Sequence, residues 1–245
     1  MPKTKLNKPP LVEVVFEIKF KDPKLVNYDL LVGELYSKLK NKYPIAEPLK
    51  PQEIPSLLMP FMVQHRFRTN KDGYPLYQLG PGIVSFNVDG ATYGNGWTGF
   101  KKELLFFIKA YSGILKDDFS SDNFERVSLR YIDKIEDPRM YPEVKEYFDN
   151  VLKTEINLKF SENSDNFSKL EDTSLSQTYQ IDDESKLFFK LRTITDGSRK
   201  LLLDSSVITT NLQDINNLNA WLNKAHDSLS DLFVKLTVNL NDLFE

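Results

Sequence analysis

The sequence predicts an α+β protein, in which a largely antiparallel sheet of seven to nine strands carries two internal helices and a long C-terminal helix. Short alternating segments follow one another through glycine-containing turns, a pattern typical of antiparallel hairpins. The helical period is present in only a few segments, and strands do not alternate with helices as they do in parallel sheets. A leucine-rich amphipathic stretch closes the sequence, and we expect it to pack on the apolar face of the sheet in a helix-grip-like arrangement.

The first half of the chain begins with a clear strand signal. Residues 11–20 alternate strictly between an apolar side and a mostly charged side. Leucines four residues apart predict a helix over residues 27–42, and five prolines between Pro44 and Pro60 impose an extended connection. Turns at Asn70–Gly73 and Gly80–Gly82 then separate three further strands, which we expect over residues 61–69, 74–79 and 83–88.

The rest of the chain contains longer uninterrupted elements. A helix is expected from about Gly99 to Lys116, after a glycine-rich loop, and an alternating strand over residues 124–135. A short helix near residues 142–152, a strand at 155–160 and a polar loop follow. Two strands, expected over residues 186–195 and 200–210, flank the hairpin turn Asp196–Arg199. A third strand, over residues 175–181, is expected to pair beside them.

The C-terminal helix is expected to begin near Asp214, a suitable N-cap residue. Leucines recur along it at seven-residue intervals, at positions 222, 229, 236 and 243. The stripe fits a helix packed on the sheet, which we favour, and it also fits a coiled-coil or dimer seam. Thr237 and Val238 weigh against the seam because both are poor helix formers.

The composition excludes several classes of chemistry. The 245 residues include no cysteine and two histidines, so there is no thiol nucleophile, disulfide framework or cysteine-ligated metal site. We expect no bound metal and no cofactor. The opening residues lack the apolar core of a signal peptide, and no apolar run is long enough to span a membrane. We therefore expect a cytoplasmic protein.

The net charge of −3 is unevenly distributed along the chain. There are 17 basic and 13 acidic residues up to Asp122, against 15 basic and 22 acidic residues after it, so the two parts carry +4 and −7. The length suits a single domain over residues 1–245. The change in composition places the one candidate subdivision near residues 117–123.

The charged faces of the expected strands give the candidate binding site. If the strands share one sheet, their non-core sides bring together charges of both signs, as on a solvated face with cross-strand ion pairs. The alternative is a curved sheet whose basic residues bind phosphate or nucleic acid, with the two glutamates holding a magnesium ion. The six candidate binding residues are Glu13, Glu17, Arg126, Arg130, Lys190 and Arg192.

Two other features have structural interpretations that we prefer. The segment Gly94–Gly99 matches G-x-G-x-x-G, but it lies between antiparallel hairpins and a helix and contains a bulky tryptophan, so we interpret it as the start of that helix rather than a dinucleotide loop. His65 and His226 lie near no evident nucleophile, and we expect both to be structural.

The N-terminal run Pro9–Phe20, with the sequence PPLVEVVFEIKF, resembles a sporadically distributed bacterial family of unknown function whose chains are of about this length. The similarity extends to Tyr93, Trp97 and Phe100, to the strand segment Arg130–Ile135, and to Ala225–Asp227, Phe233 and Thr237. Many relatives are expected to carry asparagine where this chain has Asp133. The resemblance implies a bacterial cytoplasmic protein of the kind found in mobile or phage-defence loci, and it supplies no catalytic residues.

Three functional hypotheses follow. The leading one is a non-enzymatic interaction or regulatory subunit of a bacterial multi-protein system, with a role in antiviral defence, that contacts a protein partner or a second copy through the C-terminal helix. The second is a nucleic-acid- or nucleotide-binding protein, conceivably a metal-dependent phosphotransfer enzyme, that uses the charged sheet face. The third is a small-molecule pocket between the sheet and the terminal helix, lined by Phe188, Tyr179 and Trp221.

Overall fold

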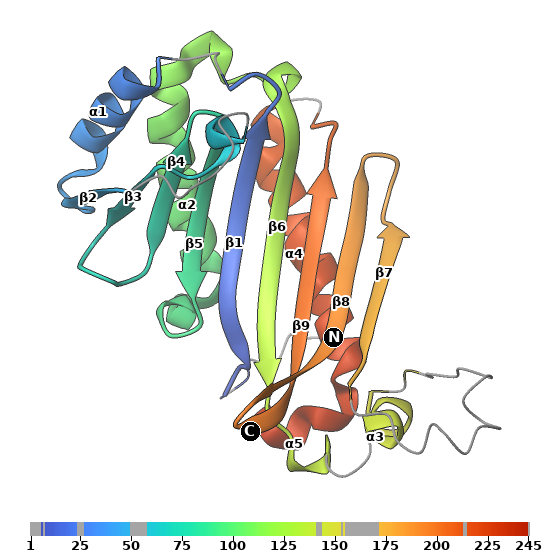
Figure 1. Cartoon of the computed structure of the whole chain (residues 1–245). Coiled ribbons are helices and arrows are strands. Elements are labelled where there is room, and N and C mark those ends of the chain that lie inside the picture. The colour runs from blue at the N-terminus through green and yellow to red at the C-terminus, as the bar shows by residue number, and fades with distance from the viewer. Residues whose placement is uncertain are drawn as a thin grey trace.

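The computed structural model confirms an α+β fold built on one nine-stranded sheet (Figure 1). The strand order is β2-β3-β4-β5-β1-β6-β9-β8-β7, and all eight neighbouring pairs are antiparallel. The N-terminal strand therefore lies in the middle of the sheet. The structure describes residues 6, 8–23, 27–49, 58–140, 144–152, 154, 172–212 and 215–244.

Eight of the nine strands are those expected from alternating segments, although β3 covers only four of the residues 61–69; β2 instead lies in the proline-rich stretch that was expected to be an extended connection. The strands are β1 (Leu11–Phe20), β2 (Ile45–Pro48), β3 (His65–Arg68), β4 (Leu76–Gly80), β5 (Ile83–Asp89), β6 (Phe124–Ile135), β7 (Ser174–Gln180), β8 (Ser185–Asp196) and β9 (Ser198–Thr209). The β8–β9 turn has Gly197 at its tip with φ of 69°, a conformation that favours glycine. The strand expected at residues 155–160 and most of the polar loop after it lie outside the described residues.

The helices are α1 (Tyr28–Leu39), α2 (Gly96–Leu115), α3 (Val144–Asn150), α4 (Leu218–Leu236) and α5 (Asn241–Phe244). Helix α2 begins three residues earlier than expected, directly after a 3-10 turn over Thr92–Asn95. Helix α4 begins at Leu218 with Asn217 as its N-cap residue, and the expected N-cap Asp214 lies outside the described residues. The helix ends at Leu236, because the poor helix formers that follow interrupt it.

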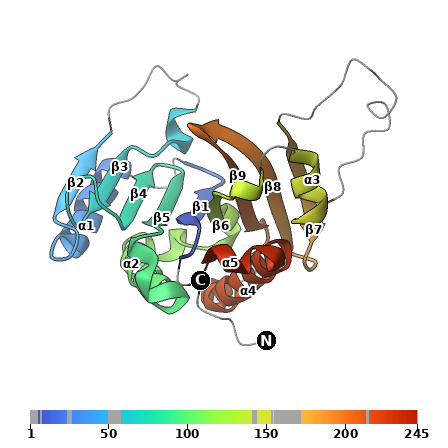
Figure 2. The ribbon, with the colours of Figure 1, turned by 90° about the horizontal axis from the view of Figure 1, so that it is seen from below.

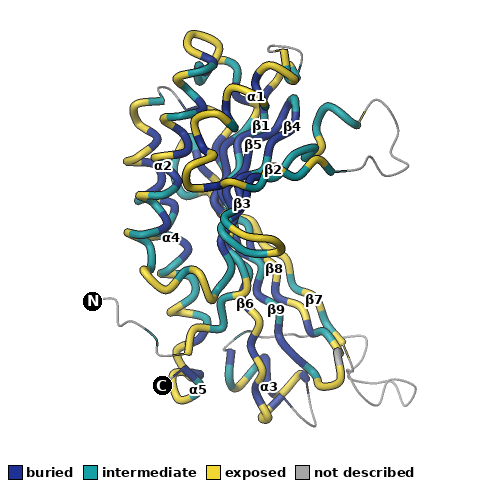
Figure 3. Tube along the Cα trace, turned by 90° about the vertical axis from the view of Figure 1, so that its left-hand side faces the viewer, coloured by how far each residue is buried: buried dark blue, intermediate teal, exposed yellow. Residues whose placement is uncertain are grey.

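Helices α1, α2 and α4 cover one face of the sheet, which we call the helix side (Figure 2). The core lies between them, and the alternating residues Val14, Phe16 and Ile18 of the central strand β1 are fully buried there. Figure 3 shows the buried backbone concentrated along the strands and on the inward sides of α2 and α4. The opposite side of the sheet, which we call the polar face, carries most of the charged residues of the strands.

The leucine stripe of α4 belongs to this core. Leu222 and Leu229 have exposed fractions of 0% and 2%, and Leu236 and Leu243 are partly buried against the same cluster. This is the favoured interpretation of the stripe, in which the helix packs on the sheet. The buried leucines are therefore not available to a partner protein as a coiled-coil or dimer seam, the alternative interpretation.

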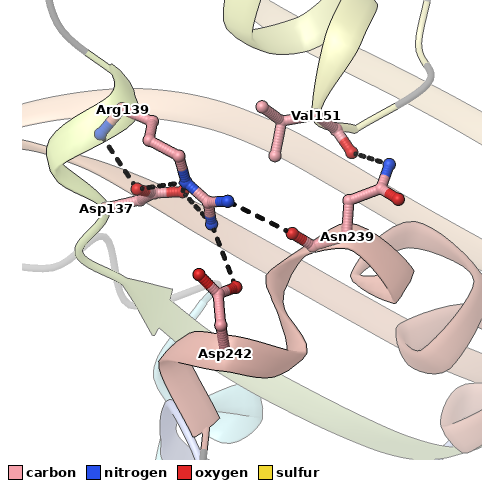
Figure 4. Close-up of polar contacts among 5 residues, drawn as sticks. All are labelled: Asp137, Arg139, Val151, Asn239 and Asp242. Atoms are coloured by element: carbon pink, nitrogen blue, oxygen red, sulfur yellow. Dashed lines mark hydrogen bonds and ion pairs between the residues drawn. The ribbon is translucent and has the colours of Figure 1, made fainter.

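The C-terminal segment is fastened to the end of β6 by a polar cluster (Figure 4). The carboxylate of Asp137 is fully buried and accepts a hydrogen bond from Arg139 Nε at 3.0 Å. The same guanidinium group contacts Asp242 of α5 at 3.4 Å. Asn239 donates a hydrogen bond to the backbone oxygen of Val151 at 2.9 Å, which ties the end of α3 to the same segment.

A second fastening joins the end of α1 to α2. Glu103 of α2 accepts hydrogen bonds from Tyr43 at 2.9 Å and from Tyr77 at 3.0 Å, and it pairs with Lys42. Burial opposes the charge on Glu103, but these three donors outweigh it and hold the pKa of the carboxyl group below its ordinary value. The two tyrosine rings are themselves fully buried and pack together, so the network sets the position of α1 on the sheet.

Candidate functional site

The pairing between strands places all six candidate binding residues on the polar face. Val15 of β1 lies between Asn87 of β5 and Arg130 of β6, and Arg130 lies opposite Ser206 of β9. Lys190 of β8 is likewise opposite Asp204 of β9, on the same face. The sheet thus brings together side chains that are far apart in the sequence.

A groove of about 300 Å³ crosses this face between β1 and β7, and we call it the polar-face groove. Its floor consists of side chains from five neighbouring strands, with basic, acidic, hydroxyl and aromatic groups all present. The lining residues are Val15, Glu17, Arg126, Ser128, Arg130, Ser176, Phe188, Phe189, Lys190, Asp204, Ser206 and Ile208.

Four of the six candidate binding residues line the groove, and two do not. Glu17, Arg126, Arg130 and Lys190 are among the lining residues. Arg192 lies on the same face two residues beyond Lys190, opposite Ser174 and Leu202. Glu13 also lies on this face, at the β5 side of β1, where it belongs to a separate hydrogen-bond network.

Two ion pairs hold part of the charge in the groove. Arg126 donates to Glu17 at 2.8 Å, from β6 to β1. Arg130 forms a two-pronged pair with Asp204 of β9, at 2.7 and 2.6 Å. The hydrogen bonds to Asp204 raise the pKa of Arg130, although burial opposes the rise. The bidentate geometry fixes Arg130 in place and directs two of its donor groups away from any ligand.

Other donors in the groove remain unused. Arg126 has one partner among the described residues, and its Nε atom is buried without a hydrogen bond. Lys190 is exposed and has no hydrogen-bond or ion-pair partner in the part of the chain that the structure describes. The buried Nε atom is covered by protein, so the donors open to a ligand are the exposed part of the Arg126 guanidinium group, whose side chain is 37% exposed, and the Lys190 ammonium group.

The polar face carries more basic than acidic side chains, although within the groove itself three basic residues stand beside two acidic ones. Among the described side chains on the polar face of β1, β6, β8 and β9, eight are basic and three are acidic, on a chain whose net charge is −3. Such a local excess attracts anions even to a protein that is acidic as a whole. The basic residues are Lys19, Arg126, Arg130, Lys134, Lys186, Lys190, Arg192 and Lys200, and the acidic ones are Glu13, Glu17 and Asp204.

Hydroxyl groups and the ring of Phe188 complete the groove, since the Phe189 ring points to the helix side. Ser128, Ser176 and Ser206 lie on its floor, and within the described part of the chain none of their hydroxyl groups has a hydrogen-bond partner. The ring of Phe188 is half-buried on β8 between the registers of Ser206 and Thr178. These serines could not be assigned to the site from the sequence, because serine in a strand does not indicate a binding site until the strand order is known.

Glu13 belongs to a network that the sequence analysis missed. Its carboxylate accepts hydrogen bonds from Asn87 at 2.8 Å and from Tyr74 at 3.2 Å. Asn87 in turn accepts from Gln78 at 2.9 Å. The two glutamates suggested to share a magnesium ion have separate partners: Glu13 is bonded to Asn87 and Tyr74, and Glu17 is paired with Arg126. Among the described residues no group of three metal-ligating side chains lies together.

The third hypothesis, a pocket between the sheet and the terminal helix, is not supported, because neighbouring residues on a strand point to opposite faces of the sheet. Phe188 faces the polar-face groove, whereas Tyr179 stacks on Phe189 on the helix side, with ring centroids 6.1 Å apart. Trp221 of α4 is buried and donates to Ser185 at 3.2 Å. The three side chains expected to line that pocket therefore do not face one cavity.

On the helix side, a cluster of polar and aromatic residues joins α2, β6 and α4. Tyr131 shares hydrogen bonds with Tyr93 at 3.1 Å and with His226 Nδ1 at 2.9 Å. Trp97 stacks on His226 with ring centroids 4.3 Å apart, so the glycine-rich segment serves the start of α2 and its packing, as expected. Asp133 lies beside this cluster, and burial raises the pKa of its carboxyl group to about 7.

Comparisons with known proteins add little. No protein-family model matches the chain, and no curated protein matches it. The solved structures that are similar to it include the di-domain ARO/CYC StfQ from the steffimycin biosynthetic pathway, at 10% sequence identity over 92% of this chain and 97% of that chain, with a TM-score of 0.19. A likeness at that TM-score supports no conclusion about this chain.

None of the helices among the described residues is both long and apolar enough to cross a bilayer. The cytoplasmic location and the family resemblance stay predictions.

Proposed function

We propose that this chain binds a nucleotide, either free or as part of a single-stranded nucleic acid, in the polar-face groove. The observation that supports this most is the set of unused donors on one concave surface. Arg126 and Lys190 offer positive charge, and three serines offer hydroxyl groups, to the oxygens of a phosphate. Phe188 offers a ring on which a base can stack.

Binding without catalysis is the function that these side chains support. Neither histidine is near the lining serines, because His65 contacts Tyr28 and His226 contacts Tyr131, both on the helix side. The serines of the groove consequently lack a histidine general base. The nearby carboxylates are occupied by arginines.

The proposal is tested by calorimetric titration of the protein with ATP and, separately, with a short single-stranded RNA. Lys190→Ala is the informative variant, because Lys190 has no partner among the described residues and its removal leaves no buried charge unpaired. Loss of a charge-assisted hydrogen bond costs about 1.5–3 kcal/mol, which is roughly a 10- to 150-fold increase in Kd. Lys186→Ala is the matched control, since Lys186 is exposed on the same face of β8 and does not line the groove.

The two ligands distinguish the two forms of the proposal. Tight ATP binding that RNA does not improve indicates a free nucleotide, and RNA binding with little affinity for ATP indicates a nucleic acid. Failure of the wild type to bind either ligand at low salt contradicts the proposal, and so does equal weakening by the two lysine variants.

The role as an interaction or regulatory subunit in antiviral defence stays a prediction. Its three motivations are the lack of a catalytic set, the acidic second half and the leucine stripe of the terminal helix, and that stripe packs against the core of the chain. A partner would therefore have to use another surface.

A further inference from the structure

Strand β7 forms one edge of the described sheet, and the described residues do not give it the usual protection of an edge. Among the described residues it pairs with β8 alone, and its sequence, Ser174–Gln180, contains neither a charged residue nor a proline. Natural sheets usually protect a long edge with lysine, proline or a bulge, because its free backbone groups can pair with another chain. A strand edge without lysine, proline or a bulge indicates that pairing of this edge with another chain is tolerated or used.

The backbone bonds to β8 show which groups of β7 point outward. The Ile181 N–H donates to Ser185, and the Thr173 carbonyl accepts from Thr193, so the odd-numbered residues bond to β8. Both backbone groups of a residue in an antiparallel ladder point to the same side, and the side alternates along the strand. The residues with outward N–H and C=O groups are therefore Ser174, Ser176, Thr178 and Gln180.

The side chains of β7 are self-complementary about Gln177. In an antiparallel pair centred on that residue, Leu175 meets Tyr179 on the helix side, and Ser176 meets Thr178 on the polar face. The Tyr179 ring is 51% exposed, and Leu175 is already partly buried against the core, so the pairing would cover apolar surface on both chains. Cross-strand pairs of an aromatic with an aliphatic residue and of two hydroxyl residues are both favourable.

We propose that β7 pairs with β7 of a second copy of this chain, antiparallel about Gln177, so that two sheets become one. The four outward residues of each copy would supply about eight backbone hydrogen bonds. Asp182 would approach Asp172 of the other copy at each end, but Asp182 is already neutralised by Lys224. Ser176 lines the polar-face groove, so the second copy would place its Thr178 at the open edge of each groove. The inference does not depend on what the groove binds.

Disulfide trapping tests the pairing and its register together. Across the twofold axis the two Gln177 Cα atoms would lie about 4.5 Å apart, a separation at which a disulfide can form. The chain has no cysteine, so Gln177→Cys carries a single thiol. Mild oxidation should convert this variant to a covalent dimer and leave Thr178→Cys, its control on the same edge, largely uncrosslinked. No dimer from Gln177→Cys, or equal yields from both variants, would overturn the proposal.

Sedimentation equilibrium supplies a second measurement without cysteine. Thr178→Pro removes an outward N–H group and leaves the bonds to β8 intact, since proline is tolerated where the N–H faces solvent. It should make the protein monomeric, whereas Thr178→Val should associate as the wild type does. Circular dichroism establishes that both variants are folded. A wild type that is monomeric at its highest soluble concentration contradicts the proposal.

Discussion

The buried carboxyl group of Asp133 makes folding stability depend on pH, and Asp133→Asn should remove that dependence. Asp133 lies on the helix side of β6 with an exposed fraction of 6%, and the described residues offer it neither a hydrogen-bond nor an ion-pair partner. Burial raises the pKa of the group from its ordinary value of 3.8 to about 7. Asparagine is also the residue that the family resemblance leads us to expect at this position.

The magnitude follows from that change in pKa. Each pKa unit corresponds to about 1.4 kcal/mol, so ionising Asp133 costs about 4 kcal/mol more in the folded protein than in the unfolded chain. Below about pH 4 both states are protonated, and the cost is absent. As the pH rises from about 4 to about 7, the unfolded chain binds fewer protons than the folded protein, so the free energy of unfolding decreases. Above about pH 7 the full cost is present.

Urea denaturation of the wild type and Asp133→Asn, from about pH 4 to about pH 8, measures the effect. The stability of the variant relative to the wild type should increase with pH, by up to about 4 kcal/mol. Asp231→Asn is the control for loss of a charge, because Asp231 is 63% exposed on α4 and pairs with Lys235. Parallel stability curves for the wild type and Asp133→Asn would refute the assignment of a buried, unpartnered carboxyl group.

Three further substitutions test other parts of the account. Glu103→Gln should lower the free energy of unfolding by about 1–3 kcal/mol at neutral pH, as measured by urea denaturation. The loss should be smaller in acid, where the carboxylate of the wild type is protonated. Equal stability of variant and wild type at neutral pH would contradict the network with Tyr43 and Tyr77. Leu222→Ala should cost about 2–5 kcal/mol because the side chain is fully buried, and sedimentation should show unchanged association; altered association would instead support the helix seam. Asp204→Asn should tighten ATP binding by roughly 0.5–1 kcal/mol, measured by calorimetry, since it removes negative charge from the groove; weaker binding would contradict an anionic ligand.

Local alternation predicts the longer strands and their two faces, but it does not predict β2 in the proline-rich stretch. Strand β6 covers the residues expected for it, Phe124–Ile135, and places Arg126 and Arg130 on the polar face. The same argument places Glu17 and Lys190 on that face. These four residues line the groove because side-chain direction has a period of two, and that period can be counted along the sequence.

The neighbours of each strand could not be predicted in this way. The central strand β1 lies between β5 and β6, and this long-range pairing brings Asn87 to Glu13. Nothing in the local sequence of β5 signals that contact. The register between β7 and β8 also explains why Phe188 and Tyr179 do not share a pocket, because Tyr179 lies opposite Leu187, whose neighbour Phe188 points to the other face.

The central claim, that a nucleotide binds in the polar-face groove, is tested most directly by proton–nitrogen correlation spectra of the arginine side chains. The Arg126 side chain is 37% exposed and is held by a single bond to Glu17, whereas Arg130 is held by two bonds to Asp204. Titration with ATP should shift the Arg126 signal, assigned by its loss in Arg126→Lys, in a saturable manner and move the Arg130 signal much less. An Arg126 signal that does not move at saturating ATP would contradict the claim.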